Sequence, residues 1–183
     1  MFQKKRRPEG ESREMRSKHG KNELDEARKI ALTHLATSAR SRSELTKRLE
    51  QDEFEPDVIE ETLIEMESLN YLDDSKFAMN WMKDRADRKG YGKTRLAQEL
   101  KGKGVDKETI QEALGSIEEE SEIANCLAAA RTKWRGDRIE GLDRAGLAKE
   151  KTKVSNFLQR RGFSWSIITK VFALLLENNQ SLS

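Results

Sequence analysis

The sequence has one cysteine, two histidines and two prolines among its 183 residues, and each scarcity excludes something. Cys126 alone cannot form an internal disulfide, and one cysteine with two histidines cannot supply a zinc site of the usual ligand spacing. Because Cys126 lies in an apolar, alanine-rich run, we expect it to be a small core residue. Two prolines in the whole chain argue against a loop-rich or β-sandwich fold.

Aromatic residues make up only 6% of the chain and the hydrophobic set 35%, against 37% charged residues. This is too little for one large core, but it suits helices that each bury a single stripe. Apolar residues recur at spacings of 3 and 4 without sustained alternation, so the prediction is an all-α fold. No apolar run reaches the ~18 residues of a membrane span, and no hydrophobic segment follows the basic N-terminus. We therefore expect a cytoplasmic protein with no membrane partner.

Catalytic signatures are missing as well. The patterns GxxxxGK[ST], GxGxxG after a strand and GxSxG do not occur. The segment KGYGKTR at residues 89–95 is like a phosphate loop only in its Gly-Lys-Thr, and it lacks the first glycine and a preceding strand. Asp73 and Asp74 could ligate a metal, but capping of a following helix is the better explanation. We expect no enzyme, no metal and no cofactor.

What the chain does contain is an apolar ladder with spacings 4, 5, 5 and 4, which occurs three times. Its rungs are Leu45, Leu49, Phe54, Ile59 and Leu63; then Leu96, Leu100, Val105, Ile110 and Leu114; then Val154, Leu158, Phe163, Ile168 and Phe172. A hydroxyl residue lies two positions before each first rung (Ser43, Thr94 and Thr152), where we predict an N-cap. The ladder predicts tandem repeats of about 50 residues.

We therefore predict three three-helix repeats at residues 24–72, 73–117 and 118–178, with a long exposed loop at 135–147 in the third. Residues 1–22 carry eight cations against three anions and almost no apolar side chains, which predicts a basic flexible tail. This tail is either an arm that contacts phosphates or a solubilising leader. The acidic third helix of repeat one faces either solvent or a basic protein surface. The apolar last helix either packs against its neighbours or binds a partner.

The stretch from residue 70 to 105 is a predicted helix, tight basic turn and second helix. Asp73 and Asp74 are expected to cap the first helix, which carries Phe77 on its apolar face. Gly90 suits the left-handed position just past that helix, and Gly92 the turn. Leu96 and Leu100 are the apolar positions of the second helix.

Cations gather around this corner and recur at equivalent positions of the other repeats. The corner of repeat two has Arg85, Arg88, Lys89, Lys93 and Arg95 with Tyr91 expected to be exposed; the others add Arg40 and Arg42, Arg131 in register with Arg85, and Lys151 and Lys153. If equivalent corners lie on one side, they form a strip suited to a phosphate backbone. The alternative is ordinary solvated surface charge. No helix shows clustered Asn, Gln and Arg for reading base edges, which disfavours a helix-turn-helix transcription factor.

The segment YLDDSKFA at residues 71–78, Arg85 within MKDRADRKGYGKTRLAQELKGKGV, and the tandem three-helix layout resemble the RecX family, bacterial regulators of the RecA recombinase. The resemblance covers residues 24–178. It implies an elongated, curved protein, without a cofactor, that lies in the groove of a RecA–single-stranded DNA filament. It also implies an inhibitor of recombination, RecA ATP hydrolysis and the SOS response. The cationic corner would face the filament or DNA, and Asp73 and Asp74 would be helix-capping signature residues.

We expect the protein to be a monomer whose partners are the RecA filament, single-stranded DNA and, as a second expectation, double-stranded DNA. Two other classes stay open on the sequence. A general DNA-binding protein would use the same cations without RecA. A helical-repeat scaffold would use none of them.

Overall fold

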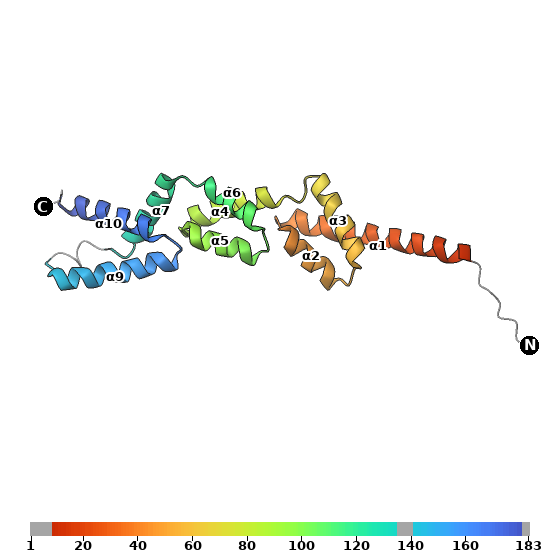
Figure 1. Cartoon of the computed structure of the whole chain (residues 1–183), viewed down its shortest axis with the longest axis horizontal. Helices are drawn as coiled ribbons and strands as arrows, with labels where there is room; N and C mark the ends of the chain where they lie inside the picture. The colour runs from red at the N-terminus through yellow and green to blue at the C-terminus, as the bar shows by residue number, and fades with distance from the viewer. Residues whose placement is uncertain (1–8, 135–140, 181–183) are drawn as a thin grey trace, which may run out of the picture. The chain divides into compact units, whose positions relative to one another are not determined.

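A computed structural model of the chain describes residues 9–134 and 141–180, which contain α-helices and no β-strand. The helices are α1 (Glu9–Thr37), α2 (Arg42–Gln51), α3 (Pro56–Ser68), α4 (Asp74–Lys89), α5 (Lys93–Gly102), α6 (Lys107–Gly115), α7 (Glu119–Arg131), α9 (Arg144–Arg160) and α10 (Trp165–Gln180) (Figure 1). The all-α prediction is confirmed. The chain divides between Asp74 and Ser75 into two compact units. None of the described helices is long and apolar enough to cross a membrane.

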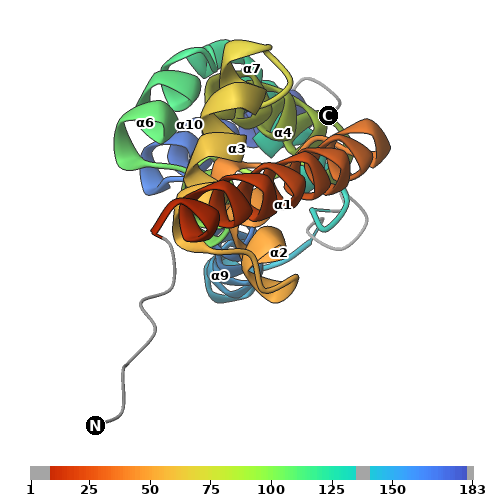
Figure 2. The same ribbon diagram turned by 90° about the vertical axis from the view of Figure 1, so that its right-hand side faces the viewer.

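The first unit is a three-helix cluster in which α3 lies across α1, as both ribbon views show (Figures 1 and 2). Its core contains Leu45 and Leu49 from α2, and Ile59, Leu63 and Met66 from α3. On α1 the fully buried positions of this core are the small residues Ala27 and Ala31, while Ile30 and Leu35 pack against it partly buried. The lack of bulk at Ala27 and Ala31 lets α3 approach the α1 backbone closely.

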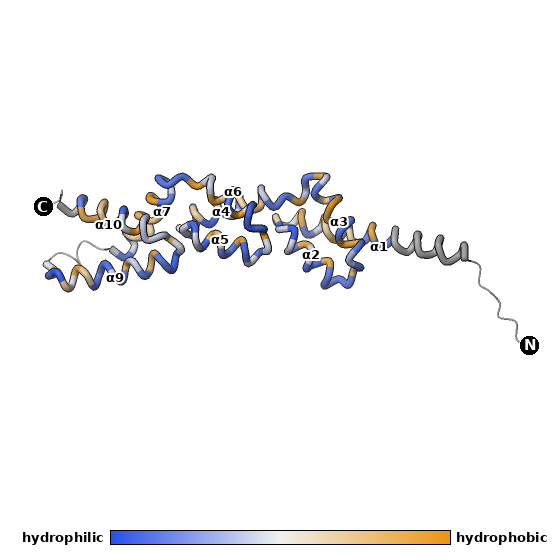
Figure 3. The backbone as a smooth tube through the Cα atoms, in the orientation of Figure 1, coloured by the Kyte–Doolittle hydropathy of each residue, from blue (hydrophilic) through white to orange (hydrophobic). Residues whose placement is uncertain are grey.

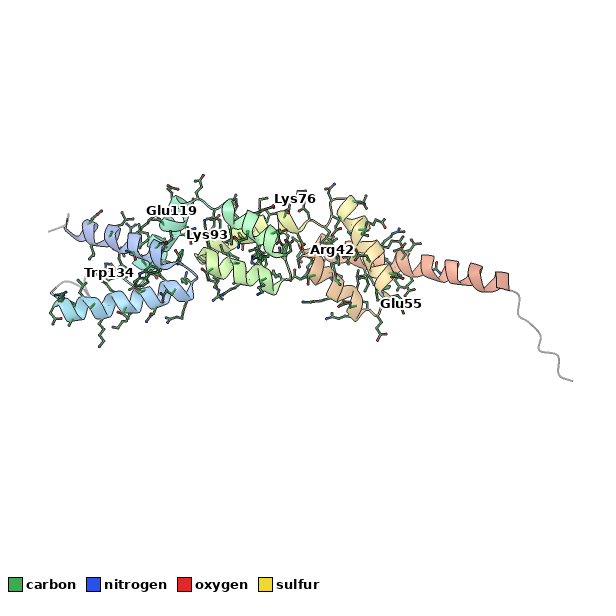
Figure 4. All side chains as sticks on the ribbon, in the orientation of Figure 1. Arg42, Glu55, Lys76, Lys93, Glu119 and Trp134 are labelled. Atoms are coloured by element: carbon green, nitrogen blue, oxygen red, sulfur yellow. The ribbon has the colours of Figure 1, made fainter. Side chains whose placement is uncertain are left out.

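The second unit contains two hydrophobic clusters. One joins α4, α5 and α6 around Leu96, Leu100 and Val105. The other joins α7, α9 and α10, and here α10 packs mainly on α7. Trp134, labelled in Figure 4 where the chain leaves α7, makes an edge-to-face contact with Phe172 at 5.4 Å between ring centroids.

The apolar ladder is the core of all three repeats. Every rung is buried except Phe54, Leu114 and Phe172, and these three pack, partly buried, against the same clusters. Hydrophobic and hydrophilic segments alternate along the helices (Figure 3). A single stripe per helix therefore suffices for each core, as the composition predicts.

The five-residue step between the second and third rungs is a helix-ending motif. The amide of Phe54 donates to the carbonyl of Leu49 at 3.3 Å, and the same bond joins Val105 to Leu100 at 3.2 Å. It recurs between Phe163 and Leu158 at 3.2 Å. This six-to-one bond is characteristic of the Schellman motif.

The residue before each third rung has a positive φ. It is Gly104 (φ 76°) in repeat two and Gly162 (φ 88°) in repeat three, but Glu53 (φ 63°) in repeat one. Glycine adopts this left-handed backbone without penalty, whereas a residue with a Cβ atom is strained there. Repeat one therefore carries backbone strain at a position where the other two repeats do not.

The predicted helix starts are wrong in several places. The N-caps are Ser41, Gly92 and Asp143, not Ser43, Thr94 and Thr152, which lie inside their helices. Helix α9 begins at Arg144, so the predicted loop 135–147 ends by residue 143; its residues 135–140 lie outside the described part. The Asp143 carboxylate accepts from the amide of Gly146 at 2.8 Å, so this glycine belongs to the first helical turn.

Helix α1 also begins earlier than predicted, at Glu9 instead of near Leu24. In the sequence, Glu9 precedes Arg13 and Glu14 precedes Lys18 by four residues, a spacing that supports a helix without any apolar stripe. Residues 9–22 of the predicted tail are therefore helical, and residues 1–8 lie outside the described part. Asp106 caps α6, since its carboxylate accepts from the amide of Thr109.

Candidate nucleic-acid interface

The turn between α4 and α5, predicted as a basic corner, is pressed against the turn between α9 and α10. The amide of Gly92 donates to the carbonyl of Arg161 at 2.9 Å, and the amide of Thr94 to that of Gly162 at 3.1 Å. The side chain of Arg161 donates from Nη1 to the Lys89 carbonyl at 2.6 Å. Gly90 has the predicted left-handed backbone, with φ 59°. The corner of repeat two is thus occupied by backbone contacts within the second unit.

Lys93 is held by contacts with Glu122 of α7 and with Ile117, which lies between α6 and α7. Its Nζ donates to the carbonyl of Ile117 at 2.7 Å and lies 3.9 Å from Oε2 of Glu122, while its amide donates to Oε1 of Glu122 at 3.3 Å (Figure 4 labels Lys93). Glu122 is only 7% exposed. A buried carboxylate requires a charged or hydrogen-bonding partner, and Lys93 supplies both. The structure therefore gives Lys93 a structural role.

Arg42, the equivalent residue of repeat one, is held in a similar way. Its amide donates to Oδ1 of Asp74 at 2.7 Å, and its guanidinium pairs with Glu60 at 2.7 Å and Glu67 at 2.8 Å. The hydrogen bond with Glu60 raises the pKa of Arg42 above its usual value. The two repeats share this arrangement. Asp74 of α4 accepts from the first amide of α2, and Glu122 of α7 accepts from the first amide of α5. Asp74 therefore supplements the Ser41 cap of α2, a contact that the sequence prediction for α4 did not include.

Two further arginines of the corner share one carboxylate. Glu99 lies 3.5 Å from Nε of Arg85 and 3.4 Å from Nε of Arg95, and it accepts from the Trp81 indole at 3.2 Å. The Arg85 guanidinium also stacks on the Trp81 ring, 4.3 Å from its centroid. Arg95 covers the ring of Tyr91 at 4.6 Å, which leaves that tyrosine half-buried and not exposed as predicted. The charge of this cluster is partly neutralised by Glu99.

The other predicted cations lie at the surface. Arg88 pairs with Asp84 on its own helix at 2.8 Å, and Lys153 pairs with Glu150. Those that make no ion pair with a described residue are Arg40, Lys89, Arg131 and Lys151. In the described part of the chain, no cluster of three His, Cys, Asp or Glu residues could hold a metal.

A stronger basic surface lies on α9, and of its residues the sequence interpretation named only Lys153. The exposed positions Lys149, Thr152, Lys153, Asn156, Gln159 and Arg160, named here the α9 outer face, follow one another at helical spacing and include no acid. The sequence interpretation found no helix with clustered Asn, Gln and Arg, but Asn156, Gln159 and Arg160 lie together on this face. Because α9 runs from Arg144 to Arg160, the whole set lies on one helical face.

Comparison with known families identifies the three repeats. The RecX first three-helix domain matches residues 27–66, the second matches 73–114 and the third matches 119–172. The chain belongs to the RecX family. Each RecX domain lies within one predicted repeat and contains most of one hydrophobic cluster.

The chain is similar to curated RecX proteins over most of its length. It is 36% identical to the regulatory protein RecX of Corynebacterium efficiens over 159 residues, which cover 87% of this chain and 76% of that protein. It is 31% identical to the regulatory protein RecX of Mycolicibacterium smegmatis over 156 residues, which cover 85% of this chain and 82% of that protein.

Two crystal structures of RecX proteins have the same fold. RecX from Lactobacillus salivarius aligns with a TM-score of 0.77 at 19% identity, covering 84% of this chain and 97% of that one. A second structure, described as regulatory protein RecX, aligns with a TM-score of 0.76 at 18% identity, covering 94% of this chain and 81% of that one.

Proposed function

We propose that this protein binds filaments of the RecA recombinase on single-stranded DNA and inhibits them by groove binding or capping. The observation that carries this proposal is the match of all three RecX domains, in order, along one chain. The curated relatives are named regulatory protein RecX, and the family name implies RecA as the partner. The protein would act in the cytoplasm as a monomer, in recombination, DNA repair and the SOS response.

Inhibition by capping needs only binding energy. A molecule bound at a growing filament end excludes the next RecA subunit, while subunits continue to leave elsewhere. RecA then loses its DNA-dependent ATPase and its ability to stimulate repressor cleavage together. A few bound copies control many subunits, so the expected stoichiometry is far below one copy per RecA.

The test is RecA ATPase on single-stranded DNA with this protein titrated in. Capping predicts inhibition at substoichiometric amounts, with filaments that shorten in electron micrographs. Inhibition that needs enough protein to coat the DNA would favour competition for phosphates. Faster ATP hydrolysis by RecA would still mean that the protein regulates RecA, but it would contradict the proposal that the protein is an inhibitor.

The second candidate is a general DNA-binding protein that acts without RecA, and the acid-free α9 outer face favours it. A variant that no longer binds DNA distinguishes the two candidate functions. A RecA-directed regulator keeps part of its inhibition through contacts with RecA itself. A general DNA-binding protein loses all of its inhibition.

A further inference from the structure

The α9 outer face is a basic stripe along one side of a 17-residue helix. The helix contains five cations and one acid, Glu150, and its opposite side packs against α7 and α10. With a rise of about 1.5 Å per residue, Lys149 and Arg160 lie about 16 Å apart along the axis. That length is enough to follow several phosphates of a DNA strand.

The cations at both ends of this face are available to a ligand. Neither Lys149 nor Arg160 makes an ion pair with another described residue, and Lys153 pairs only with Glu150 on the same helix. The equivalent helices differ. In α5 the carboxylate of Glu99 lies close to Arg85 and Arg95, and α2 has Glu50 exposed. Among the three second helices, α9 has the surface with the least internal neutralisation.

An exposed tryptophan follows directly. Trp165 is the first residue of α10, five residues after Arg160, and it is 62% exposed. The core positions of α10 are Ile167, Ile168, Val171 and Leu175, so Trp165 is not needed to fill the cluster. An exposed indole beside a basic surface is the combination by which proteins bind single-stranded nucleic acid, because every base has a face that can stack.

We propose that the α9 outer face and Trp165 bind single-stranded DNA directly. Lys149, Lys153 and Arg160 neutralise successive phosphates, Asn156 and Gln159 donate to phosphate or sugar oxygens, and one unpaired base stacks on Trp165. The biological meaning of this site rests on the proposed function, in which the protein meets single-stranded DNA inside a filament. The binding itself needs no RecA, so the two proposals can fail separately.

The charge part is tested on the full chain with a fluorescent oligo(dT) and no RecA. The double variant Lys149→Gln with Arg160→Gln should bind roughly tenfold more weakly at low salt. Its slope of log affinity against log salt should be shallower by about 1.4, because two phosphate contacts are lost at about 0.7 each. The matched control is Lys101→Gln with Lys107→Gln, two exposed cations of the same unit without a described ion pair. It changes the net charge equally and should leave the slope unchanged.

The stacking part has a spectroscopic readout. Oligo(dT) should quench part of the tryptophan fluorescence of the wild type. Trp165→Phe should keep the affinity within about threefold and lose that quenching, and Trp165→Ala should bind about fivefold or more weakly. Trp81 and Trp134 remain in both variants, so their emission reports that the fold is intact.

Several outcomes would overturn the site. If the α9 double variant and the control double variant lose the same amount of oligo(dT) affinity, the protein attracts DNA only through its overall charge. If quenching is unchanged in Trp165→Phe, the base does not stack on Trp165. A preference for duplex over oligo(dT) would contradict a stacked, unpaired base. If the α9 pair keeps its affinity for naked DNA but no longer inhibits RecA, then α9 binds the recombinase and only the DNA site is wrong. If wild type and variants bind DNA alike while all fail to inhibit RecA, both proposals fail.

Discussion

The backbone of Gly92 lies so close to Gly162 that a Cβ atom at residue 92 would sit 2.5 Å from the Gly162 carbonyl oxygen. A Cβ atom at residue 162 would in turn sit 2.3 Å from the amide nitrogen of Arg95. Both contacts are with backbone atoms, which cannot rotate away as a side chain can. Two glycines 70 positions apart thus join the second and third RecX domains within one compact unit.

Gly92→Ala should therefore destabilise the protein by about 1–3 kcal/mol, because the two turns must separate to accept one methyl group. Urea unfolding followed by circular dichroism measures the change. Gly102→Ala is the control, since a Cβ atom there meets nothing within 4 Å, and it should be neutral or slightly stabilising. Similar losses of stability in both variants would mean that the α4–α5 and α9–α10 turns do not pack as closely as described.

Leu100→Ala should cost about 2–5 kcal/mol, because this ladder rung is fully buried and its loss leaves a cavity. The control is Met79→Ala on α4 of the same domain, whose side chain is 49% exposed, with an expected change of about 0.5 kcal/mol. The same urea experiment compares them. A loss below 1 kcal/mol at Leu100 would contradict a ladder-based core.

Glu53→Gly should stabilise the first unit by about 0.5–1 kcal/mol. The substitution relieves the strain of a left-handed glutamate and introduces the residue that the other two repeats have there. Thermal unfolding would show a higher midpoint. Glu50→Gly, three residues earlier and inside α2, should lose about 1 kcal/mol because glycine is unfavourable within a helix. Destabilisation by both variants would show that the Glu53 backbone is not strained.

Glu99→Gln should strengthen binding to single-stranded DNA if the corner of repeat two contributes to it. The variant removes the carboxylate that lies near Arg85 and Arg95 but keeps an acceptor for the Trp81 indole. Stability should change by less than about 1 kcal/mol, because these charges are partly exposed. Glu112→Gln on α6, exposed and equal in charge change, is the control. Equal gains from both would assign the effect to net charge, and no gain would leave the corner a structural element.

Cys126 should resist alkylation in the folded protein. Burial, with a smaller contribution from the charge of Glu122, raises the pKa of the thiol from its ordinary value of 9.0 to about 12. At pH 8 the reactive thiolate is then about a thousandfold rarer than in the unfolded chain. Iodoacetamide labelling followed by mass spectrometry should be slow in buffer and rapid in urea. Equal rates would show that the pocket around Cys126 opens readily.

The ladder could be predicted from the sequence because its spacing is a direct record of local structure. Four residues separate two rungs on one helical face, and five separate the two ends of a Schellman motif, as at Leu49 and Phe54. The N-caps could not be predicted from recurrence, since Ser41, Gly92 and Asp143 share no side-chain chemistry. Gly146 suggested a loop, although a glycine in a first turn capped by Asp143 costs little.

The ion pairs of the candidate site were less predictable from the sequence. The cations around residues 85–95 are visible in the sequence, but their partners come from other helices. Glu99 reaches Arg85 from α5, and Glu122 reaches Lys93 from α7. Which cations are neutralised depends on tertiary packing, which spacing along one helix does not encode. The α9 outer face became apparent only once the exposure of each residue of the helix was known.

The docking of the two turns also sets an order of events during synthesis. Helix α5 starts with amides whose acceptors are Glu122 and the carbonyls of Arg161 and Gly162. The last of these leaves the ribosome about seventy residues after α5 itself, since chains emerge from the N-terminal end. A nascent or truncated chain that stops before residue 161 therefore holds a second domain with an open corner, and the arrival of the third domain closes it.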